Sequence, residues 1–175
     1  ATKIWYYKVE AIDSCGGTVK TSAISHTVRL RGEAQPGASN TLNWSDYGFW
    51  STGVDRYLIF RSVNGIREPI PATVVNSNGV RSFLDLVLED YFSCSTICYV
   101  AAAVQESGDT NGFLDTCYSN EVCLEQDPLV YVPSAFHPGG GINELFTPVG
   151  VFLPTDGYRF CVFDRWGKIV FNTAE

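Results

Sequence analysis

One acidic run has the spacing of oxygen ligands. The segment Asp109-Thr110-Asn111-Gly112-Phe113-Leu114-Asp115 places side-chain oxygens at alternate positions, as a calcium-binding loop does. An EF-hand loop requires glycine at its sixth position and glutamate at its twelfth, where this chain has Leu114 and Asn120. The Asn-Gly pair within the run instead favours a plain turn.

A second acidic stretch contains the carboxylates Asp85, Glu89 and Asp90. Glycoside hydrolases use such carboxylates in pairs. These residues lie at the end of a predicted strand, which favours a solvated corner over an active site. The sequence contains no nucleophile elbow, no phosphate-loop lysine and no cysteine–histidine pair in a suitable setting. We therefore expect no enzyme activity, no metal site and no cofactor.

Two further features could bind ligands. The glycine run Gly139–Gly141 could surround an anion, but neither a helix nor a lysine follows it, so turns with positive φ are favoured. Phe49 and Trp50, next to Tyr47, could stack on a sugar. Such aromatic residues more commonly fill cores or form contacts between domains, and this is the interpretation we favour.

The composition limits the class of protein. Of 175 residues, 45% are hydrophobic, and the 16 glycines and 8 prolines without helical periodicity predict an all-β fold. A net charge of -7 opposes binding to nucleic acid, because phosphates are neutralised by clustered Lys and Arg. No stretch is apolar and long enough to span a membrane. Six cysteines without metal-ligand spacing indicate an oxidising compartment.

Residues 1–30 predict a β-hairpin, with a strand from Ile4 to Ile12 and a return strand through Ile24 to Leu30. Part of this hairpin recurs later in the chain. Residues 7–11 align with residues 99–103, and residues 25–30 align with residues 119–124. The same two-stranded unit is therefore expected twice.

Between the two copies the sequence predicts one complete β module. Asn64-Gly65 is a strong signal for a hairpin turn, and Pro69 and Pro71 confine the next stretch to an edge strand or a loop. Core positions are expected at Trp44, Tyr57 and Tyr99. The predicted strands are Thr41–Trp44, Val54–Arg61, Val80–Leu88 and Tyr99–Ala103.

The hairpin register also predicts a disulfide. Cys98 precedes the core residue Tyr99 and Cys123 follows Val122, so both cysteines are expected on the outer face, opposite one another. A bond between Cys94 and Cys117 is disfavoured, because that register separates them by about ten residues at roughly 3.3 Å each. Cys94–Cys123 remains an alternative, since strand ends can bulge. Cys15 and Cys161 have no assigned partner.

The sharpest motif lies between Tyr131 and Thr173. A loop rich in proline and glycine precedes two alternating strands, Tyr158–Phe163 and Lys168–Phe171, and the turn Asp164–Gly167 joins them into a predicted hairpin. Trp166 is expected either to fill a small core or to contact a receptor, with Arg165 stacked on its ring. The motif residues expected to act in recognition are Pro133, Phe136, Pro138, Gly139, Gly141, Asn143, Phe146, Arg165, Trp166 and Gly167.

This segment resembles the start of the gliding-motility-associated C-terminal domain, the type B sorting domain of type IX secretion in Bacteroidetes. That family begins with V-P-x-A-F-x-P-N-G-D-G-I-N-D-x-F and continues to a strand, an R-W-G turn and a V-F strand. Gly140 and Glu144 stand where the family has Asp, and the family's later W-x-G segment is not reached by Glu175. The matching residues are Val132, Pro133, Ala135, Phe136, Pro138, Gly139, Gly141, Ile142, Asn143, Phe146, Arg165, Trp166, Gly167, Val170 and Phe171.

The module before it resembles a fibronectin type III domain, through Trp44, the strand Tyr57–Arg61, Asp85 before the Cys-Tyr strand, and the closing Ser119–Val122. The two resemblances imply three parts. Residues 1–30 would be the last two strands of a preceding fibronectin type III-like module, and residues 31–127 a complete one. Residues 128–175 would be the N-terminal part of the sorting domain.

These resemblances imply a secreted or cell-surface protein that is exported across the outer membrane of a Bacteroidetes bacterium. The type IX outer-membrane translocon and associated surface-attachment proteins would recognise the sorting domain, while the β-sandwich modules would act as spacers or adhesion units. Two alternatives stay open. The modules could accompany a secreted hydrolase whose catalytic domain lies upstream, or they could form a fibre in which other copies of the chain cover unpaired strand edges.

Overall fold

The computed structural model describes residues 3–87, 95–107, 114–141, 144–153 and 159–174. Their regular structure consists of β-strands paired antiparallel in several sheets, which confirms the all-β prediction. The part of the chain that is described contains no helix able to cross a membrane. The chain forms two compact units, Ala1–Leu86 with Thr96–Glu125 and Val87–Ser95 with Gln126–Glu175. Glu89, Asp90, Cys94 and the acidic run 109–113 lie outside the described residues.

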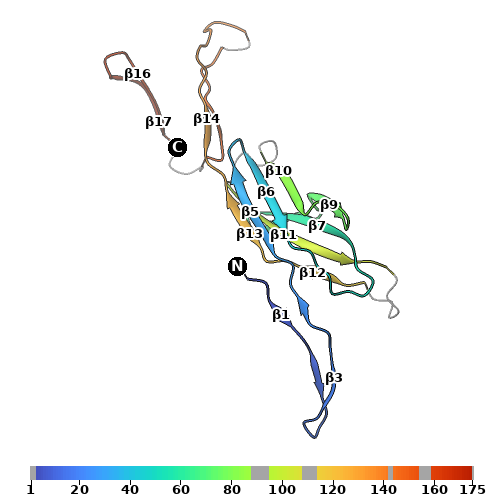
Figure 1. Cartoon of the computed structure of the whole chain (residues 1–175). Coiled ribbons are helices and arrows are strands. Elements are labelled where there is room, and N and C mark those ends of the chain that lie inside the picture. The colour runs from blue at the N-terminus through green and yellow to red at the C-terminus, as the bar shows by residue number, and fades with distance from the viewer. Residues whose placement is uncertain (1–2, 88–94, 108–113, 142–143, 154–158, 175) are drawn as a thin grey trace. The chain divides into compact units, whose positions relative to one another are not determined.

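The first unit begins with the predicted hairpin, drawn in blue in Figure 1. Strand β1 (Tyr6–Tyr7) pairs with β4 (Ser25–His26), and β2 (Glu10–Ile12) pairs with β3 (Thr18–Thr21). The two ladders are separated at Ser22, whose hydroxyl accepts a hydrogen bond from the Val9 N–H at 2.8 Å. A serine side chain thus takes the place of a backbone acceptor where the ladder is interrupted.

The predicted repeat is present, but the structure shifts its second half by three residues relative to the alignment that the sequence predicts. The Ser22 N–H bonds to the Val9 carbonyl, and the Ser119 N–H bonds in the same way to the Ala101 carbonyl, both at 2.8 Å. The Ser119 hydroxyl accepts from the Ala101 N–H at 2.9 Å, as Ser22 does from Val9. The equivalent of Ser119 is therefore Ser22 and not Ser25, a serine three positions later whose sequence neighbours are similar.

The module that follows consists of two sheets (Figure 1). In the larger sheet β7 (Val54–Val63) pairs with β11 (Thr96–Gln105) along most of its length, and the shorter strands pair with these two. Every strand that the sequence predicted for this module is present. The smaller sheet contains β5 (Leu30–Gln35), β6 (Ser39–Trp44) and β10 (Ser82–Leu86). The larger sheet contains β7 (Val54–Val63), β8 (Ile66–Arg67), β9 (Thr73–Asn76), β11 (Thr96–Gln105), β12 (Thr116–Tyr118) and β13 (Val122–Glu125).

The core of the module contains the three aromatic residues that the sequence placed there. Trp44, Tyr57 and Tyr99 are 5%, 1% and 0% exposed. The Trp44 and Tyr57 rings lie 6.1 Å apart, and the Tyr57 hydroxyl accepts a hydrogen bond from the Tyr47 N–H. The division of residues 1–127 at residue 30 stays a prediction, but Leu30 is the first residue of β5 and is buried.

Aromatic side chains connect the N-terminal hairpin to the loop that follows β6. The His26 ring lies 4.6 Å from Phe49 and 5.7 Å from Tyr47, and Tyr47 lies 4.4 Å from Trp50. The Tyr47 hydroxyl is 3.0 Å from the Ser25 hydroxyl. Phe49 and Trp50 therefore belong to an internal contact, in agreement with the interpretation favoured from the sequence.

Asp85 is not at a solvated corner as predicted, because its side chain is buried between the two sheets. It accepts a hydrogen bond from the Tyr99 hydroxyl at 2.7 Å and lies 3.3 Å from the Arg61 guanidinium. Asn40 donates to the same hydroxyl at 2.8 Å. Burial raises the pKa of Tyr99 far above its ordinary value, so the hydroxyl stays protonated as the donor. The sequence prediction failed because Asp85 occupies the inward-facing alternation of β10.

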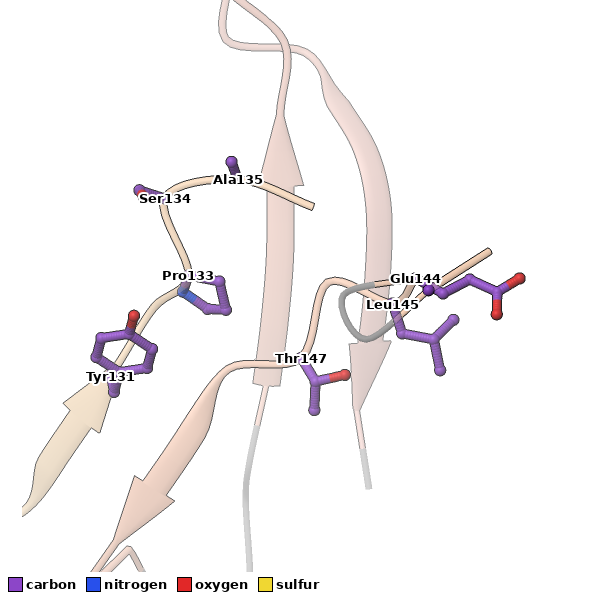
Figure 2. A pocket seen from close by; sticks show the side chains of 8 residues that line it. Tyr131, Pro133, Ser134, Ala135, Glu144, Leu145 and Thr147 are labelled. Atoms are coloured by element: carbon purple, nitrogen blue, oxygen red, sulfur yellow. The ribbon is translucent and has the colours of Figure 1, made fainter. Parts of the chain in front are cut away.

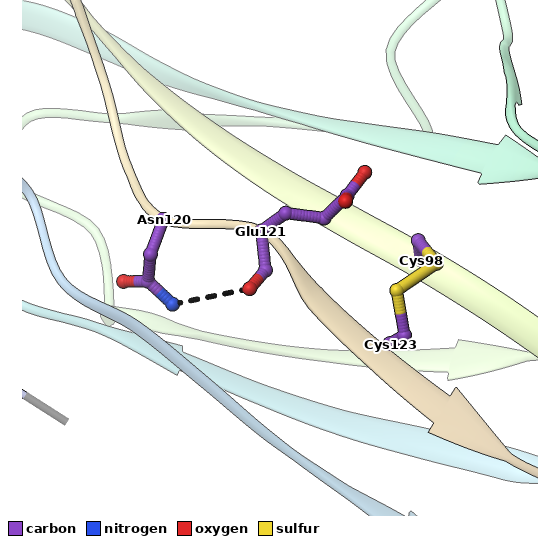
Figure 3. Close-up of a disulfide and its surroundings, with 4 residues drawn as sticks. All are labelled: Cys98, Asn120, Glu121 and Cys123. Carbon is purple, nitrogen blue, oxygen red and sulfur yellow. Dashed lines mark hydrogen bonds between the residues drawn. A yellow bond between two sulfur atoms is a disulfide. The ribbon is translucent and has the colours of Figure 1, made fainter. Parts of the chain in front are cut away.

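The predicted disulfide between Cys98 and Cys123 is present. The two cysteines are direct partners in the register of β11 and β13, and they lie on the outer face beside Glu121 (Figure 3). Cys117 lies opposite Ala103 and is a free thiol. Cys15 and Cys161 are the other free thiols of the described chain. Because the bonded pair sits at one ladder position, the disulfide follows from strand register alone.

Replacing Trp44 with alanine should lower the free energy of unfolding by about 3–5 kcal/mol, since a large buried ring would leave a cavity. Denaturant unfolding measures this value. Trp44→Phe is the control, because the Trp44 Nε1 atom is buried without a partner among the described residues. Phenylalanine keeps a ring and removes that N–H. A loss of unfolding free energy below roughly 1 kcal/mol for Trp44→Ala would contradict the core assignment.

Replacing Asp85 with alanine should cost about 3 kcal/mol, because it takes the acceptor from the buried Tyr99 hydroxyl and removes one of the two carboxylates that pair with Arg61, while Glu68 stays 3.1 Å from that guanidinium. Tyr99→Phe should cost less, about 1–3 kcal/mol, since Asp85 keeps its contact with Arg61. Urea unfolding of both variants decides the order. Equal stability of Asp85→Ala and the parent would show that the buried cluster does not hold the sheets together.

Candidate recognition site

The motif loop of the second unit spans residues 132–148 and connects two short strands. Strand β14 (Leu129–Tyr131) pairs with β15 (Val149–Val151), with Tyr131 opposite Val149. The loop is therefore held at its base by a hairpin ladder. Gly150 lies on β15, where a Cβ would overlap the Leu153 side chain, so no larger residue fits without a shift.

The glycine run adopts the conformation predicted for it. The φ angles of Gly139, Gly140 and Gly141 are 108°, 127° and 117°. Residues with a Cβ rarely adopt such φ angles. None of the three has a neighbour within 4 Å of the position that a Cβ would occupy. The glycines are thus needed for the backbone path of the loop and not for close packing. Ile142 and Asn143 lie outside the described residues.

Phenylalanine rings connect the two halves of the motif. Phe136 lies 5.7 Å from Phe146 across the loop, and Phe146 lies 6.2 Å from Phe160. Phe160 lies 6.0 Å from Phe171. The motif residues Phe136, Phe146 and Phe171 therefore belong to one row of rings, which we call the phenylalanine row. Phe160 completes the row, although the sequence motif did not single it out.

The two arms of the loop enclose a hollow of ≈ 670 Å³ (Figure 2). Among the residues that line it, only Glu144 carries a charge, while Ser134 and Thr147 contribute hydroxyl groups. Tyr131 lies at the base of one arm and Leu145 on the other. The hollow has the size of a ligand pocket, and apart from the Glu144 carboxylate its lining is uncharged. The full lining is Tyr131, Pro133, Ser134, Ala135, Gly141, Glu144, Leu145 and Thr147.

The second half of the motif is a hairpin of β16 (Arg159–Phe163) and β17 (Ile169–Ala174), as predicted. Asp164 organises its turn. One oxygen of its carboxylate accepts hydrogen bonds from the N–H groups of Trp166 and Lys168, each at 2.9 Å. Gly167 donates to the Asp164 carbonyl at 3.0 Å and has a φ of 83°. The sequence did not assign this role to Asp164, although aspartate three residues before glycine is a signal for such a turn.

The same turn occurs between β2 and β3. There the Asp13 carboxylate accepts from the N–H groups of Cys15 and Gly17, and Gly16 has a φ of 84°. Ser14 and Cys15 occupy the positions that Arg165 and Trp166 occupy in the other turn. Because the turn forms there without arginine or tryptophan, its geometry does not require either of those side chains.

Arg165 and Trp166 are displayed on the surface of the second unit. The Arg165 guanidinium lies 4.0 Å from the Trp166 ring centroid, and Trp166 is 76% exposed. The stacking prediction is confirmed, and in the described residues Trp166 does not fill a core. The turn therefore presents a guanidinium stacked on an indole, a cationic and aromatic surface.

The sequence matches no family model and no curated protein. The assignment of this segment therefore depends on the motif and on the geometry described above.

Replacing Asp164 with alanine should open the turn between β16 and β17, because it removes two hydrogen bonds worth roughly 1 kcal/mol each. Amide hydrogen exchange of residues 164–169 should accelerate about tenfold or more. Arg165→Ala and Trp166→Ala should leave exchange in this hairpin within about a factor of three of the parent. Strong acceleration in either of these two variants would mean that the displayed pair supports the fold.

Proposed function

We propose that the segment from residue 128 onward is an address recognised by the outer-membrane translocon of type IX secretion and its surface-attachment proteins. The residues before it would act as fibronectin type III-like spacer or adhesion modules of a secreted or cell-surface protein. The observation that carries the proposal is the stacked, solvent-exposed Arg165–Trp166 pair, whose turn forms at Asp13 with Ser14 and Cys15 in its place. Side chains that a fold does not need are available for recognition.

The phenylalanine row supports the proposal in a second way. It joins the loop residues Phe136 and Phe146 to the hairpin that displays Arg165 and Trp166. A receptor that contacts both parts of the motif would meet a surface that is already held together, which reduces the ordering cost of binding. Arginine and tryptophan are also the residue types that most often dominate the energy of protein interfaces.

The first unit is suited to an extracellular setting. Its Cys98–Cys123 disulfide forms and persists in oxidising compartments. The two sheets around Trp44 and Tyr99 form a compact core, as a spacer module requires.

The test is export of a reporter fused to the native C-terminal region that begins at residue 126. A Bacteroidetes host with a functional type IX translocon should place the reporter outside the cell, and a host without the translocon should retain it. The double variant Arg165→Ala with Trp166→Ala should reduce export at least tenfold while the hairpin stays folded.

Arg159→Ala is the matched control, because it removes an exposed arginine of the same hairpin outside the turn. It should be exported at the parental level. Parental export of the double variant would remove Arg165 and Trp166 from the signal. Retention of the unmodified fusion in a competent host would overturn the sorting function as a whole.

A further inference from the structure

A small hollow lies against strands β5 and β6 of the first unit. Its volume is ≈ 260 Å³, and every residue that lines it except Ile4 comes from residues 29–45. Arg31 lies opposite Asn43 in the register of the two strands. The hollow is therefore built by the module itself. The full lining is Ile4, Arg29, Arg31, Asn43, Trp44 and Ser45.

Arg29 extends the same face one residue before β5. Its N–H donates to the Ser45 hydroxyl at 3.0 Å, and its carbonyl accepts from the Ser45 N–H at 3.0 Å, so the two residues lie opposite one another. Because side chains alternate along a strand, Arg29 and Arg31 lie on one face. Their partners on the neighbouring strand lie on that face too. Two guanidinium groups, an amide and a hydroxyl thus gather at the hollow.

The two guanidinium groups of the hollow have no carboxylate partner. Neither Arg29 nor Arg31 forms an ion pair with another of the described residues. In the same unit Arg56, Arg61 and Arg81 each pair with an aspartate. Acidic residues are not scarce, because the chain has a net charge of -7. The hollow is therefore a local site of positive charge on an acidic protein.

A buried donor at the hollow also lacks an acceptor. Among the described residues only two buried side-chain nitrogens have no hydrogen-bond partner, Arg29 Nε and Trp44 Nε1, and both residues line the hollow. A buried N–H without an acceptor is unfavourable, and the cost is larger when the group is charged. An anion bound at Arg29 would provide the acceptor and balance the charge.

We propose that this hollow binds a sulfate or phosphate group. The guanidinium of arginine presents its N–H donors in a planar fork that matches the oxygens of such groups, and these charge-assisted hydrogen bonds are stronger than neutral ones. The Asn43 amide and the Ser45 hydroxyl add donors from the second strand. Donors on two strands suit an anion whose oxygens point in several directions better than a planar carboxylate.

The surroundings of the hollow limit the ligand to one anionic group. Only two cationic residues line it, and the net charge of -7 opposes the binding of an extended polyanion. Its volume lies just below the usual range of small-molecule pockets. Arg31 and Asn43 are exposed, so the group can arrive as a free ion or as an ester on a larger molecule. The site lies in the first unit and goes beyond the proposed sorting function.

Titration of the ¹⁵N-labelled 175-residue chain with sodium phosphate tests the proposal by nuclear magnetic resonance. Ionic strength is held constant with sodium chloride, since salt screens exposed charges. The Arg29 Nε–H resonance should shift saturably because it gains an acceptor, while that of Arg56 should stay in place. Chemical shifts are preferred to melting temperatures, because phosphate stabilises folded proteins in general.

Variants separate the hollow from the overall charge. Arg29→Gln and Arg31→Gln should each weaken phosphate binding at least fivefold. Arg56→Gln is the matched control, because it removes the same charge from an arginine that pairs with Asp55, and its affinity should stay within about twofold of the parent. Arg29→Lys keeps the charge but removes the Nε–H, so binding should weaken at least threefold.

The backbone amides of residues 29–31 and 43–45 report binding in all of these variants. Unchanged amide positions in the rest of the first unit report an intact fold. Glucose 6-phosphate then identifies the source of the group. Binding at least as tight as that of inorganic phosphate would assign the site to an ester on a larger molecule, and binding of inorganic phosphate alone would assign it to the free ion.

Three results would overturn the proposal. Arg29 could show no saturable shift with phosphate, sulfate or glucose 6-phosphate. Arg56→Gln could weaken binding as much as Arg29→Gln, which would reduce the effect to net charge. Acetate could bind more tightly than phosphate, which would make the hollow a carboxylate site.

Discussion

The antiparallel pairing of β7 with β11 is the interaction on which the rest of the first unit depends. The pairing runs from Ile97 opposite Val63 to Val104 opposite Arg56, and each of the two strands holds shorter strands on its other edge. Because side chains alternate along a strand, this register directs Tyr57 and Tyr99 into the core together. It also leaves Cys98 on the outer face, where β13 brings Cys123 beside it.

At several strand ends and breaks in the described residues, polar side chains take over hydrogen bonds from the backbone. Ser22 and Ser119 accept hydrogen bonds from strand N–H groups where each hairpin ladder is interrupted. Asn120 pairs with both the N–H and the carbonyl of Leu30, as a neighbouring strand would. Asp13 and Asp164 close their turns in the same way. Side chains thus satisfy these backbone groups without additional strands, including the partly buried ones of Leu30 and Ala101.

The second unit separates residues that build the structure from residues that it displays. Asp164 and Gly167 form the turn, the glycine run sets the path of the loop, and phenylalanine rings join the two. Arg165 and Trp166 are left on the surface. Under the proposed function this division lets a receptor contact the displayed pair while other residues hold the framework. Recognition would then depend on a few exposed side chains and not on a deep pocket.

The sequence by itself determined the features that depend on near neighbours and on the two-residue period of a strand. These include the all-β class, the module strands, the turns at Asn64-Gly65 and Asp164–Gly167, and the Cys98–Cys123 bond. Only the tertiary structure decided that Asp85 is buried, because that depends on which face of β10 meets Arg61 and Tyr99. It also decided between Ser22 and Ser25, since both serines fit the local pattern and only the ladder shows which one bonds to Val9. The exposure of Trp166 was decided in the same way, because burial depends on elements that pack from elsewhere in the chain, and sequence spacing carries no record of them.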